Sequence, residues 1–167
     1  MRLFVAIQLN EEMKDALQEM QDYMHSRGVK GNYTKRDNLH LTLAFIGEFD
    51  DPDIILEAID RAGLRPFEIT LSGTGSFKSL WWAGMDGGMA LQSFARRLRR
   101  ELESAGIPYD RKRFSPHITL IRRPECCGRD TEQEILAALN DTKAIKMTID
   151  HASLMCSDRG ERGMIYT

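Results

Sequence analysis

The chain has 167 residues, of which 42% are hydrophobic and 29% are charged, and its net charge is −2. This length fits one large domain or two small lobes that share a core, and the charge excludes a uniformly basic protein that coats nucleic acid. No segment approaches the roughly 20 consecutive apolar residues that span a membrane, and the first residues lack the pattern of a signal peptide. We therefore expect a cytoplasmic protein without membrane contact.

Strand and helix patterns alternate through the first half of the chain. Asn10 can cap a helix over 11–26, because apolar residues follow it at helical spacing, and Gly28 and Gly31 should end that helix. We also predict strands over 3–9, 39–46 and 67–71, a helix from Pro52 onward and a turn over 72–79.

The same order begins again at Leu80. We predict helices over 89–105 and 131–139 and strands over 80–85, 117–121, 144–149, 152–156 and from 164 onward. His117 follows His40 by 77 residues, and Leu80 follows Leu3 by the same number. We therefore predict an internal duplication, with half-repeats of about 1–79 and 80–167 in one two-lobed α+β domain over 1–167. The lobes should be related by an approximate two-fold axis and face each other across a groove.

The two halves agree best in the stretches NLHLTLAFIGE, residues 38–48, and FSPHITLIRRP, residues 114–124. Residues two apart point to the same face of a strand. His40 and Thr42 should therefore share one face while their apolar neighbours take the other, and His117 and Thr119 repeat this arrangement. Each half would present one imidazole and one hydroxyl to the groove.

Two imidazoles and two hydroxyls suit in-line attack at a phosphate. Because imidazole has a reference pKa of about 6.5, one neutral histidine can accept a proton from water and one protonated histidine can donate a proton to the leaving oxygen. The hydroxyls can hold the non-bridging oxygens by hydrogen bonds. This chemistry needs no metal.

The cysteines do not indicate a metal or a disulfide either. Cys126 and Cys127 are adjacent, Cys156 makes the count odd, and the chain contains neither C-x-x-C nor H-x-x-x-H. We expect reduced thiols, no metal and no cofactor.

A structural role is the alternative for each of these features. A single His-x-Thr in a strand is usually structural, whereas two copies at the repeat spacing, among only four histidines, favour function. We expect His25 and His151 to be surface or structural residues. The basic cluster at 96–100 should lie on an exposed helix face, whereas those at 111–113 and 122–123 flank the second motif and could attract a phosphate.

The pair HLTLAFIGE and SPHITLIRR closely resembles the motifs of the two-histidine phosphoesterase superfamily. With its opening MRLFVAIQL, the chain resembles over nearly its whole length the bacterial and archaeal RNA 2',3'-cyclic phosphodiesterases, historically also called 2'-5' RNA ligases. This resemblance implies two lobes, each an antiparallel sheet with helices outside, around a V-shaped or cradle-like cleft. It also implies metal-independent hydrolysis of the 2',3'-cyclic phosphate at an RNA 3' end, which leaves a 2'-phosphate.

The resemblance also assigns roles to the motif residues. His40 would be the general acid toward the 3' oxygen and His117 the base that activates water, although the symmetry makes these roles easy to exchange. Thr42 and Thr119 would bind the phosphate. Arg122 stands where the family often has an arginine that contacts the ligand, with a solvated strand end as the alternative.

Aromatic residues near the motifs would form a base pocket. The resemblance implies this role for Phe45 and Phe114, with core packing as the alternative for Phe45. The family often has a tryptophan shortly before the first motif, and here Tyr33 stands nearby, where it could stack on a base. The expected partner is an RNA 3' end with a 2',3'-cyclic phosphate, with tRNA halves among its sources, and we expect a monomer because the site lies in the chain's own cleft.

Other reactions share this site chemistry. They are RNA 2'-5' ligation, opening of ADP-ribose 1",2"-cyclic phosphate and cleavage of 2',5'-linked oligonucleotides. A module that binds RNA ends without turnover is a different class, and the intact histidine pair argues against it. A duplicated protein with structural histidines is the remaining alternative.

Overall fold

The computed structural model describes residues 2–141, 144–158 and 161–166, with side chains for 2–141 and 144–157. Its strands are β1 (Arg2–Gln8), β2 (Val29–Tyr33), β3 (His40–Glu48), β4 (Phe67–Phe77), β5 (Leu80–Asp86), β6 (His117–Cys126), β7 (Lys146–Ile149), β8 (Ser153–Asp158) and β9 (Glu161–Tyr166). Its helices are α1 (Glu11–Ser26), α2 (Pro52–Ala62), α3 (Gly88–Ser104), α4 (Glu132–Leu139) and the short 3₁₀ helix η1 (Arg36–Asn38).

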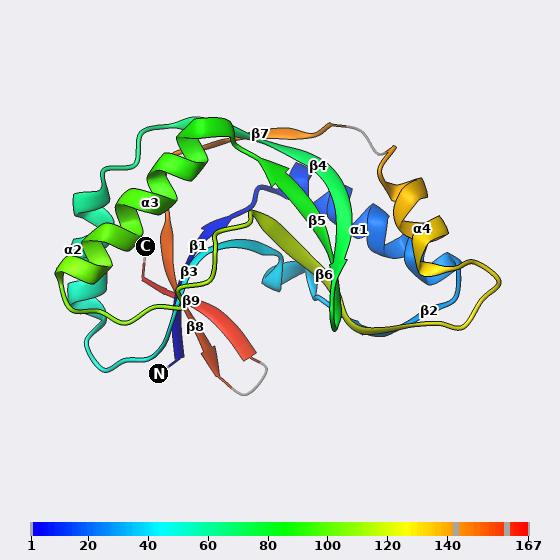
Figure 1. Ribbon diagram of the computed structural model, residues 1–167, viewed down its shortest axis with the longest axis horizontal. Coiled ribbons are helices and arrows are strands. Elements are labelled where there is room, and N and C mark those ends of the chain that lie inside the picture. Colours follow the sequence, from blue (N-terminus) through cyan, green and yellow to red (C-terminus); the bar gives the residue numbers. More distant parts are fainter. Residues whose placement is uncertain (1, 142–143, 159–160, 167) are drawn as a thin grey trace.

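Two antiparallel sheets form the framework (Figure 1). Sheet A has the strand order β3-β1-β8-β9, and sheet B has the order β2-β6-β5-β4-β7. Every pairing between neighbouring strands is antiparallel. The predicted α+β fold with two antiparallel sheets is therefore confirmed.

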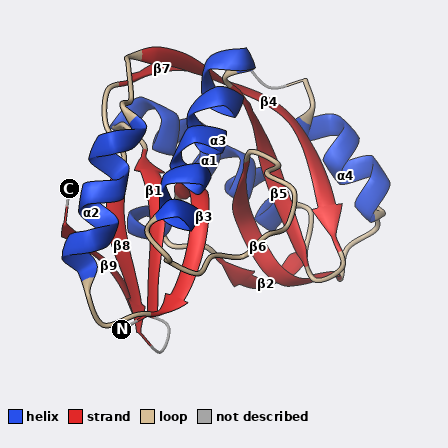
Figure 2. Ribbon diagram, turned by 60° about the vertical axis from the view of Figure 1, so that its left-hand side comes forward, coloured by secondary structure: helices blue, strands red, loops and turns tan. Residues whose placement is uncertain are grey.

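Helices cover one face of each sheet. The pair α2 and α3 packs on sheet A, whereas α1 and α4 pack on sheet B (Figure 2). The predicted cap of α1 is present, because the Asn10 side chain accepts a hydrogen bond from the Met13 backbone nitrogen at 2.9 Å. In α4, Thr131 and Glu134 form a capping box. Among the described residues, no helix is both long and apolar enough to cross a membrane.

Each lobe draws on both halves of the sequence. The strands β2 and β4 precede residue 80 yet belong to sheet B, while β8 and β9 follow it yet belong to sheet A. Likewise α1 packs on sheet B, and α3, which begins 77 residues later, packs on sheet A. The two half-repeats therefore interlock, and the boundary at residue 79 lies in the β4–β5 turn instead of between the lobes.

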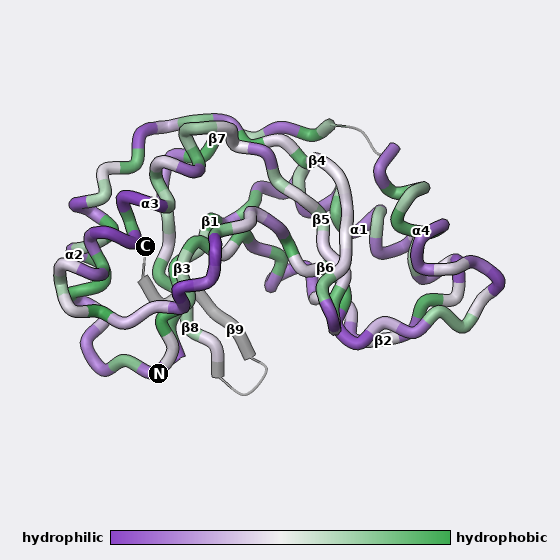
Figure 3. Tube along the Cα trace, viewed as in Figure 1, coloured by the Kyte–Doolittle hydropathy of each residue, from purple (hydrophilic) through white to green (hydrophobic). Residues whose placement is uncertain are grey.

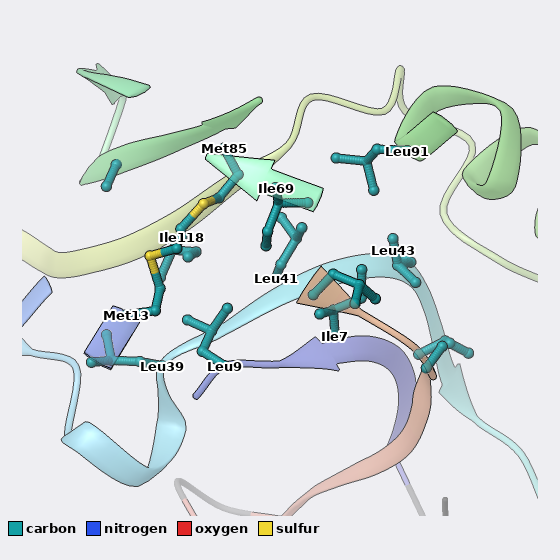
Figure 4. Close-up of a cluster of buried hydrophobic side chains, with 14 of the residues drawn as sticks. Ile7, Leu9, Met13, Leu39, Leu41, Leu43, Ile69, Met85, Leu91 and Ile118 are labelled. Atoms are coloured by element: carbon teal, nitrogen blue, oxygen red, sulfur yellow. The ribbon is translucent and has the colours of Figure 1, made fainter. Parts of the chain in front are cut away.

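One hydrophobic core joins the two lobes (Figure 4). It contains Leu41 and Ile118, the middle residues of the two His-x-Thr motifs, and both side chains are buried. Burial of such a side chain stabilises the fold by about 1.5–3 kcal/mol. Because side chains alternate along a strand, the burial of these two residues directs the neighbouring histidines and threonines to the opposite face.

The sequence pattern does not predict β2. This strand contains Lys30, Gly31 and Asn32 and lacks the apolar alternation of a typical strand, but it forms the edge of sheet B through its pairing with β6. At Gly31 the backbone φ is 153°, and a Cβ would lie 2.8 and 2.9 Å from the carbonyl oxygens of Arg123 and Arg122. Gly31, which we expected only to help end the preceding helix, therefore permits the close strand pairing.

The predicted turn over 72–79 is wrong for residues 72–77. These residues continue β4, and only Lys78 and Ser79 form the turn to β5. One glycine of this stretch, Gly75, has a packing role, because a Cβ there would overlap the ring of Trp82 on the paired strand. The strand is therefore long enough to carry Phe77 to the edge of the site.

Candidate functional site

The strands β3 and β6 carry the two His-x-Thr motifs and contact each other where the sheets meet. His40 and Thr42 from β3 line the same cleft as His117 and Thr119 from β6, and this cleft has a volume of about 580 Å³. The structure thus brings together the two imidazoles and two hydroxyls that we predicted to share one groove.

A β-bulge in β3 decides which residues reach the cleft. Opposite β3, Ala6 pairs with Thr42 but Val5 pairs with Ala44, so Leu43 is the extra residue. Under strict alternation Phe45 would share the buried face with Leu43. The bulge reverses the alternation beyond it, and Phe45 therefore faces the cleft.

A second bulge occurs at the equivalent position of β6. Trp82 pairs with Thr119 but Trp81 pairs with Ile121, so Leu120 is the extra residue. This residue follows the bulge of β3 by 77 positions, and the bulge turns Arg122, the equivalent of Phe45, into the cleft. The two bulges at equivalent positions support the predicted duplication.

The same pairings correct one detail of the predicted repeat. Ala6 and Trp82 both lie opposite a motif threonine, so β5 follows β1 by 76 residues. The offset of 77 between Leu3 and Leu80 does not describe equivalent positions, whereas it does describe His40 and His117.

Both histidines are held in the same tautomer. His40 Nδ1 lies 2.6 Å from the Asn38 carbonyl oxygen, and His117 Nδ1 lies 2.6 Å from the Ser115 carbonyl oxygen. A carbonyl oxygen can only accept a hydrogen bond, so Nδ1 is the donor in both rings. Nε2 is then the nitrogen that can accept or donate a proton in a reaction.

An aromatic ring packs against each imidazole. The ring centroids of His40 and Phe4 lie 4.9 Å apart, and those of His117 and Phe77 lie 5.0 Å apart with the planes at 90°. Trp82 lies 6.1 Å from His117. These contacts and the carbonyl hydrogen bonds together limit rotation of the imidazoles.

The backbone that orients His40 is anchored to α1 through Arg36 in η1. The Arg36 guanidinium donates to Asp15 at 2.7 Å, to Gln18 at 2.5 Å and to the carboxylate of Glu11. The hydrogen bonds to Glu11 and Asp15 raise the pKa of Arg36 above its ordinary value. The η1 turn, which ends at Asn38, is therefore fixed relative to sheet B while His40 belongs to sheet A.

The backbone before His117 is anchored in the opposite direction. Arg99 of α3 donates to the carbonyl oxygens of Lys112 at 2.7 Å and Leu43 at 3.3 Å, and the Asp110 backbone nitrogen donates to the Phe45 carbonyl oxygen at 2.8 Å. The hydrophilic segment 110–113 of the loop between α3 and β6 thus runs along β3 (Figure 3). The expectation of an exposed helix face at 96–100 is wrong for Arg99, which is half-buried.

The other predicted site residues lie in the cleft, in a groove beside it, or, for Tyr33, outside both. Phe45 and Arg122 line the cleft. Phe114 lines an adjoining groove, where its ring lies 5.7 Å from the Arg99 guanidinium.

Tyr33 is not among the residues that line the cleft. Its hydroxyl donates to the Val29 carbonyl oxygen at 2.7 Å, and its ring stacks on His25 at 5.5 Å. Burial raises the pKa of the Tyr33 hydroxyl. Its neighbour Thr34 lines the cleft instead.

Sequence reasoning missed several cleft residues. Arg2 reaches the cleft because β1 pairs with β3, and its guanidinium lies 5.6 Å from the centre of the Phe45 ring. Lys112 also lines the cleft. It belongs to the basic cluster at 111–113, and this cluster was the sequence feature that could have predicted it as a cleft residue. The remaining cleft residues outside the predicted set are Phe4, Thr34, Asn38, Leu80, Asp110 and Ser157.

The cysteines take no part in the cleft. All three are free thiols, and burial is the main cause that raises the pKa of Cys126. Within the described part of the chain, no three histidine, cysteine or acidic side chains gather as a group that could hold a metal ion.

The fold and the cleft define a two-lobed α+β protein with one His-x-Thr motif on each side of its site. The family sequence model of the 2'-5' RNA ligase superfamily matches residues 9–161 of this chain. The chain belongs to this family.

Curated relatives match over most of the chain. One, from Thermotoga maritima, is 36% identical over 99% of this chain and 91% of its own length. Another, from Thermus thermophilus, is 38% identical over 74% of this chain and 69% of its own length. Both are named RNA 2',3'-cyclic phosphodiesterase.

Solved structures share the fold. A crystal structure of a Thermus thermophilus protein has a TM-score of 0.75 and 30% identity, and the match covers 100% of this chain and 94% of that chain. E. coli LigT complexed with 3'-AMP has a TM-score of 0.74 and 24% identity, with 99% and 94% covered. At that identity LigT shows the fold alone.

Proposed function

We propose that the protein hydrolyses the 2',3'-cyclic phosphate at the 3' end of RNA and leaves a 2'-phosphate. One observation carries this proposal: two imidazoles from equivalent half-sites share one cleft, and equivalent Nδ1 hydrogen bonds orient them. Opening a cyclic phosphate by water needs one proton acceptor and one proton donor. The names of the Thermotoga and Thermus relatives support the choice of substrate.

The two histidines perform complementary proton transfers. Nε2 of neutral His117 accepts a proton from water while the water oxygen forms a bond to phosphorus. The bond between phosphorus and the 3' oxygen breaks, and Nε2 of protonated His40 donates its proton to that oxygen. The products are a 2'-phosphate and a 3'-hydroxyl, and proton exchange with solvent restores both histidines.

The threonines and Arg122 hold the phosphate during this transfer. The hydroxyls of Thr42 and Thr119 donate to non-bridging oxygens from opposite lobes, and a hydrogen bond to a charged group contributes about 1.5–3 kcal/mol. Arg122, whose side chain is exposed, adds a cation to the lining of the cleft. These groups act before and during bond breaking, so they position the phosphorus between the two imidazoles.

We propose that the reaction is metal-independent, because imidazoles supply both proton transfers and the hydroxyls and Arg122 hold the phosphate oxygens. A tRNA-derived substrate, the cytoplasm as location and the monomeric state stay predictions from the sequence.

The test uses a short RNA that ends in a 2',3'-cyclic phosphate, with EDTA present. Separation of 2'-phosphate, 3'-phosphate and unreacted ends should show only the 2'-phosphate for the wild type. His40→Ala and His117→Ala should lose it, whereas His151→Ala should retain it because His151 contacts Asp150 outside the cleft. Absence of turnover by folded wild-type protein would contradict the proposal. A joined product in the presence of RNA with a 5'-hydroxyl would identify ligation.

A further inference from the structure

A second groove opens beside the cleft, between β3, the β4–β5 turn and the loop before β6. Its volume is about 490 Å³, within the range of about 300–1,000 Å³ that is typical of small-ligand sites. It shares Thr42, Phe45 and His117 with the cleft, among other lining residues. A ligand that fills the cleft can therefore continue into this groove along the protein surface.

The groove is cationic although the chain has a net charge of −2. Its lining contains one carboxylate, Asp110, and the four cationic side chains of Lys78, Arg99, Lys112 and Arg113. One oxygen of that carboxylate already accepts a hydrogen bond from the Lys112 backbone nitrogen at 3.0 Å. All of these cations except Arg99 are exposed, so the groove favours an anionic ligand.

Exposed aromatic rings lie among these cations. Phe45 is 36% exposed and Phe77 is 45% exposed, and among the described side chains Met89 is the one further large hydrophobic residue that is exposed. The ring of Phe77 lies perpendicular to the His117 ring and 5.6 Å from the Trp82 ring, and its side chain stays exposed beside these contacts. Exposed aromatic rings next to cations are typical of surfaces that bind single-stranded RNA, because every base can stack on them.

We propose that this groove binds the nucleotide that precedes the cyclic end of a single-stranded RNA. The base of that nucleotide stacks on Phe77. Lys112, which lines both the cleft and the groove, faces the phosphodiester between the last two nucleotides, and Lys78 contacts the next phosphate. This inference rests on the proposed function and adds a binding site for the penultimate nucleotide of the RNA.

Three substrates isolate the contribution of the preceding base. They are adenosine 2',3'-cyclic phosphate, the diadenosine dinucleotide that ends in the same cyclic phosphate, and that dinucleotide with an abasic first residue. Wild-type kcat/KM should be higher for the full dinucleotide, by about 5- to 150-fold for one stacked base. The abasic dinucleotide should lose most of this advantage.

Variants of the β4–β5 turn test the residues. Phe77→Ala should reduce the ratio of dinucleotide to mononucleotide kcat/KM by about 5- to 150-fold, and Phe77→Trp should keep it. The ratio is informative because any disturbance of His117 affects both substrates. Lys78→Ala should make the negative slope of log kcat/KM against log salt shallower by about 0.7 for a longer RNA, because one phosphate contact is lost. Met89→Ala, on the 84% exposed side chain of α3, is the matched control.

The outcomes separate this inference from the proposed function. Equal wild-type kcat/KM for the dinucleotide and mononucleotide, or a ratio that Phe77→Ala leaves unchanged, would overturn the subsite while hydrolysis stands. Absence of turnover with every substrate would contradict the proposed function. In that case calorimetric affinity for the dinucleotide with a 2'-phosphate decides the subsite: weaker binding by Phe77→Ala supports it, and equal binding overturns it.

Discussion

Phe45 in the His40 half-site and Arg122 in the His117 half-site occupy equivalent positions, five residues after each histidine, and both face the cleft. Around them the half-sites agree in the carbonyl bond to each Nδ1 and in the motif threonine. The residues to which we assign the proton transfers and phosphate binding are thus the same in both halves, whereas Phe45 and Arg122 differ in size and charge. A duplicated site with unequal flanks can hold an asymmetric ligand in one direction.

The two half-sites also differ in how they are anchored. The turn before His40 is fixed by the ion pairs of Arg36 with Glu11 and Asp15. The loop before His117 is instead fixed by Arg99, which bonds backbone carbonyls. Arg36 binds α1, which packs on sheet B, whereas Arg99 belongs to α3, which contacts β3 of sheet A and β4 of sheet B. Interlocked half-repeats therefore hold the two imidazoles at a fixed relation.

Removing either imidazole should have the largest effect on activity, and the effect should be similar for the two half-sites. His40→Ala and His117→Ala should each lower kcat by about 10²–10⁴, because each removes one proton transfer. The double variant should lose far less than the product of the two single losses, since the pair acts as a unit. Single-turnover rates measure all three, and fully multiplicative losses would contradict a paired site.

The middle residues of the two motifs should contribute about equally to the free energy of unfolding. Leu41→Ala and Ile118→Ala should each lower the free energy of unfolding by about 2–5 kcal/mol, because both leave a cavity in the one shared core. Urea unfolding measures the loss, with Met89→Ala as an exposed control. Two separate unfolding transitions, with each variant shifting only one, would show that the lobes do not share a core.

The motif threonines test whether both halves hold the phosphate. Thr42→Val and Thr119→Val should each raise the activation free energy by about 1.5–3 kcal/mol, because each loses a hydrogen bond to a charged oxygen. Measured as kcat/KM, similar losses are expected from both. A loss confined to one variant would mean that only one half-site binds the phosphate.

The smallest effect should come from the start of α1. Asn10→Ala should lower the free energy of unfolding by about 1 kcal/mol, because Asn10 caps the helix. The equivalent position, 77 residues on, is Gly87, which has no side chain to cap α3 and where a Cβ would overlap Leu91. There the Asp86 carboxylate accepts a hydrogen bond from the Gly88 backbone nitrogen at 2.9 Å instead. Thermal unfolding of Asn10→Ala and Asn10→Asp checks this, and equal destabilisation by both would exclude a capping role.

The sequence predicts the repeating elements and the four central groups because both depend on local patterns. Helical spacing locates α1 and α3, and alternation places His40 and Thr42 on one face. The exchange of β4 and β8 between the sheets is not visible in this way, because element order does not state which sheet a strand joins. The orientation of Phe45 toward the cleft could not be predicted either, because it depends on the bulge at Leu43, and this bulge arises from the pairing of β3 with β1.

The placement of Tyr33 shows the same limit. Proximity to the motif in sequence suggested a stacking residue, but β2 pairs with β6, and the Tyr33 ring packs on His25. Conversely, Arg2 lies far from His40 in sequence and reaches the cleft through the pairing of β1 with β3. Contacts across strands therefore decide the periphery of the site.

The most direct test of the paired half-sites uses a cyclic phosphate in which sulfur replaces the leaving 3' oxygen. A thiolate leaves without protonation, so this substrate needs the general base but not the general acid. We predict that His40→Ala regains most of the wild-type rate with the sulfur substrate while His117→Ala stays slow. Rescue of His117→Ala alone would keep the pair and exchange the two roles. Equal rescue of both variants, or of neither, would contradict a division of acid and base between the two half-sites.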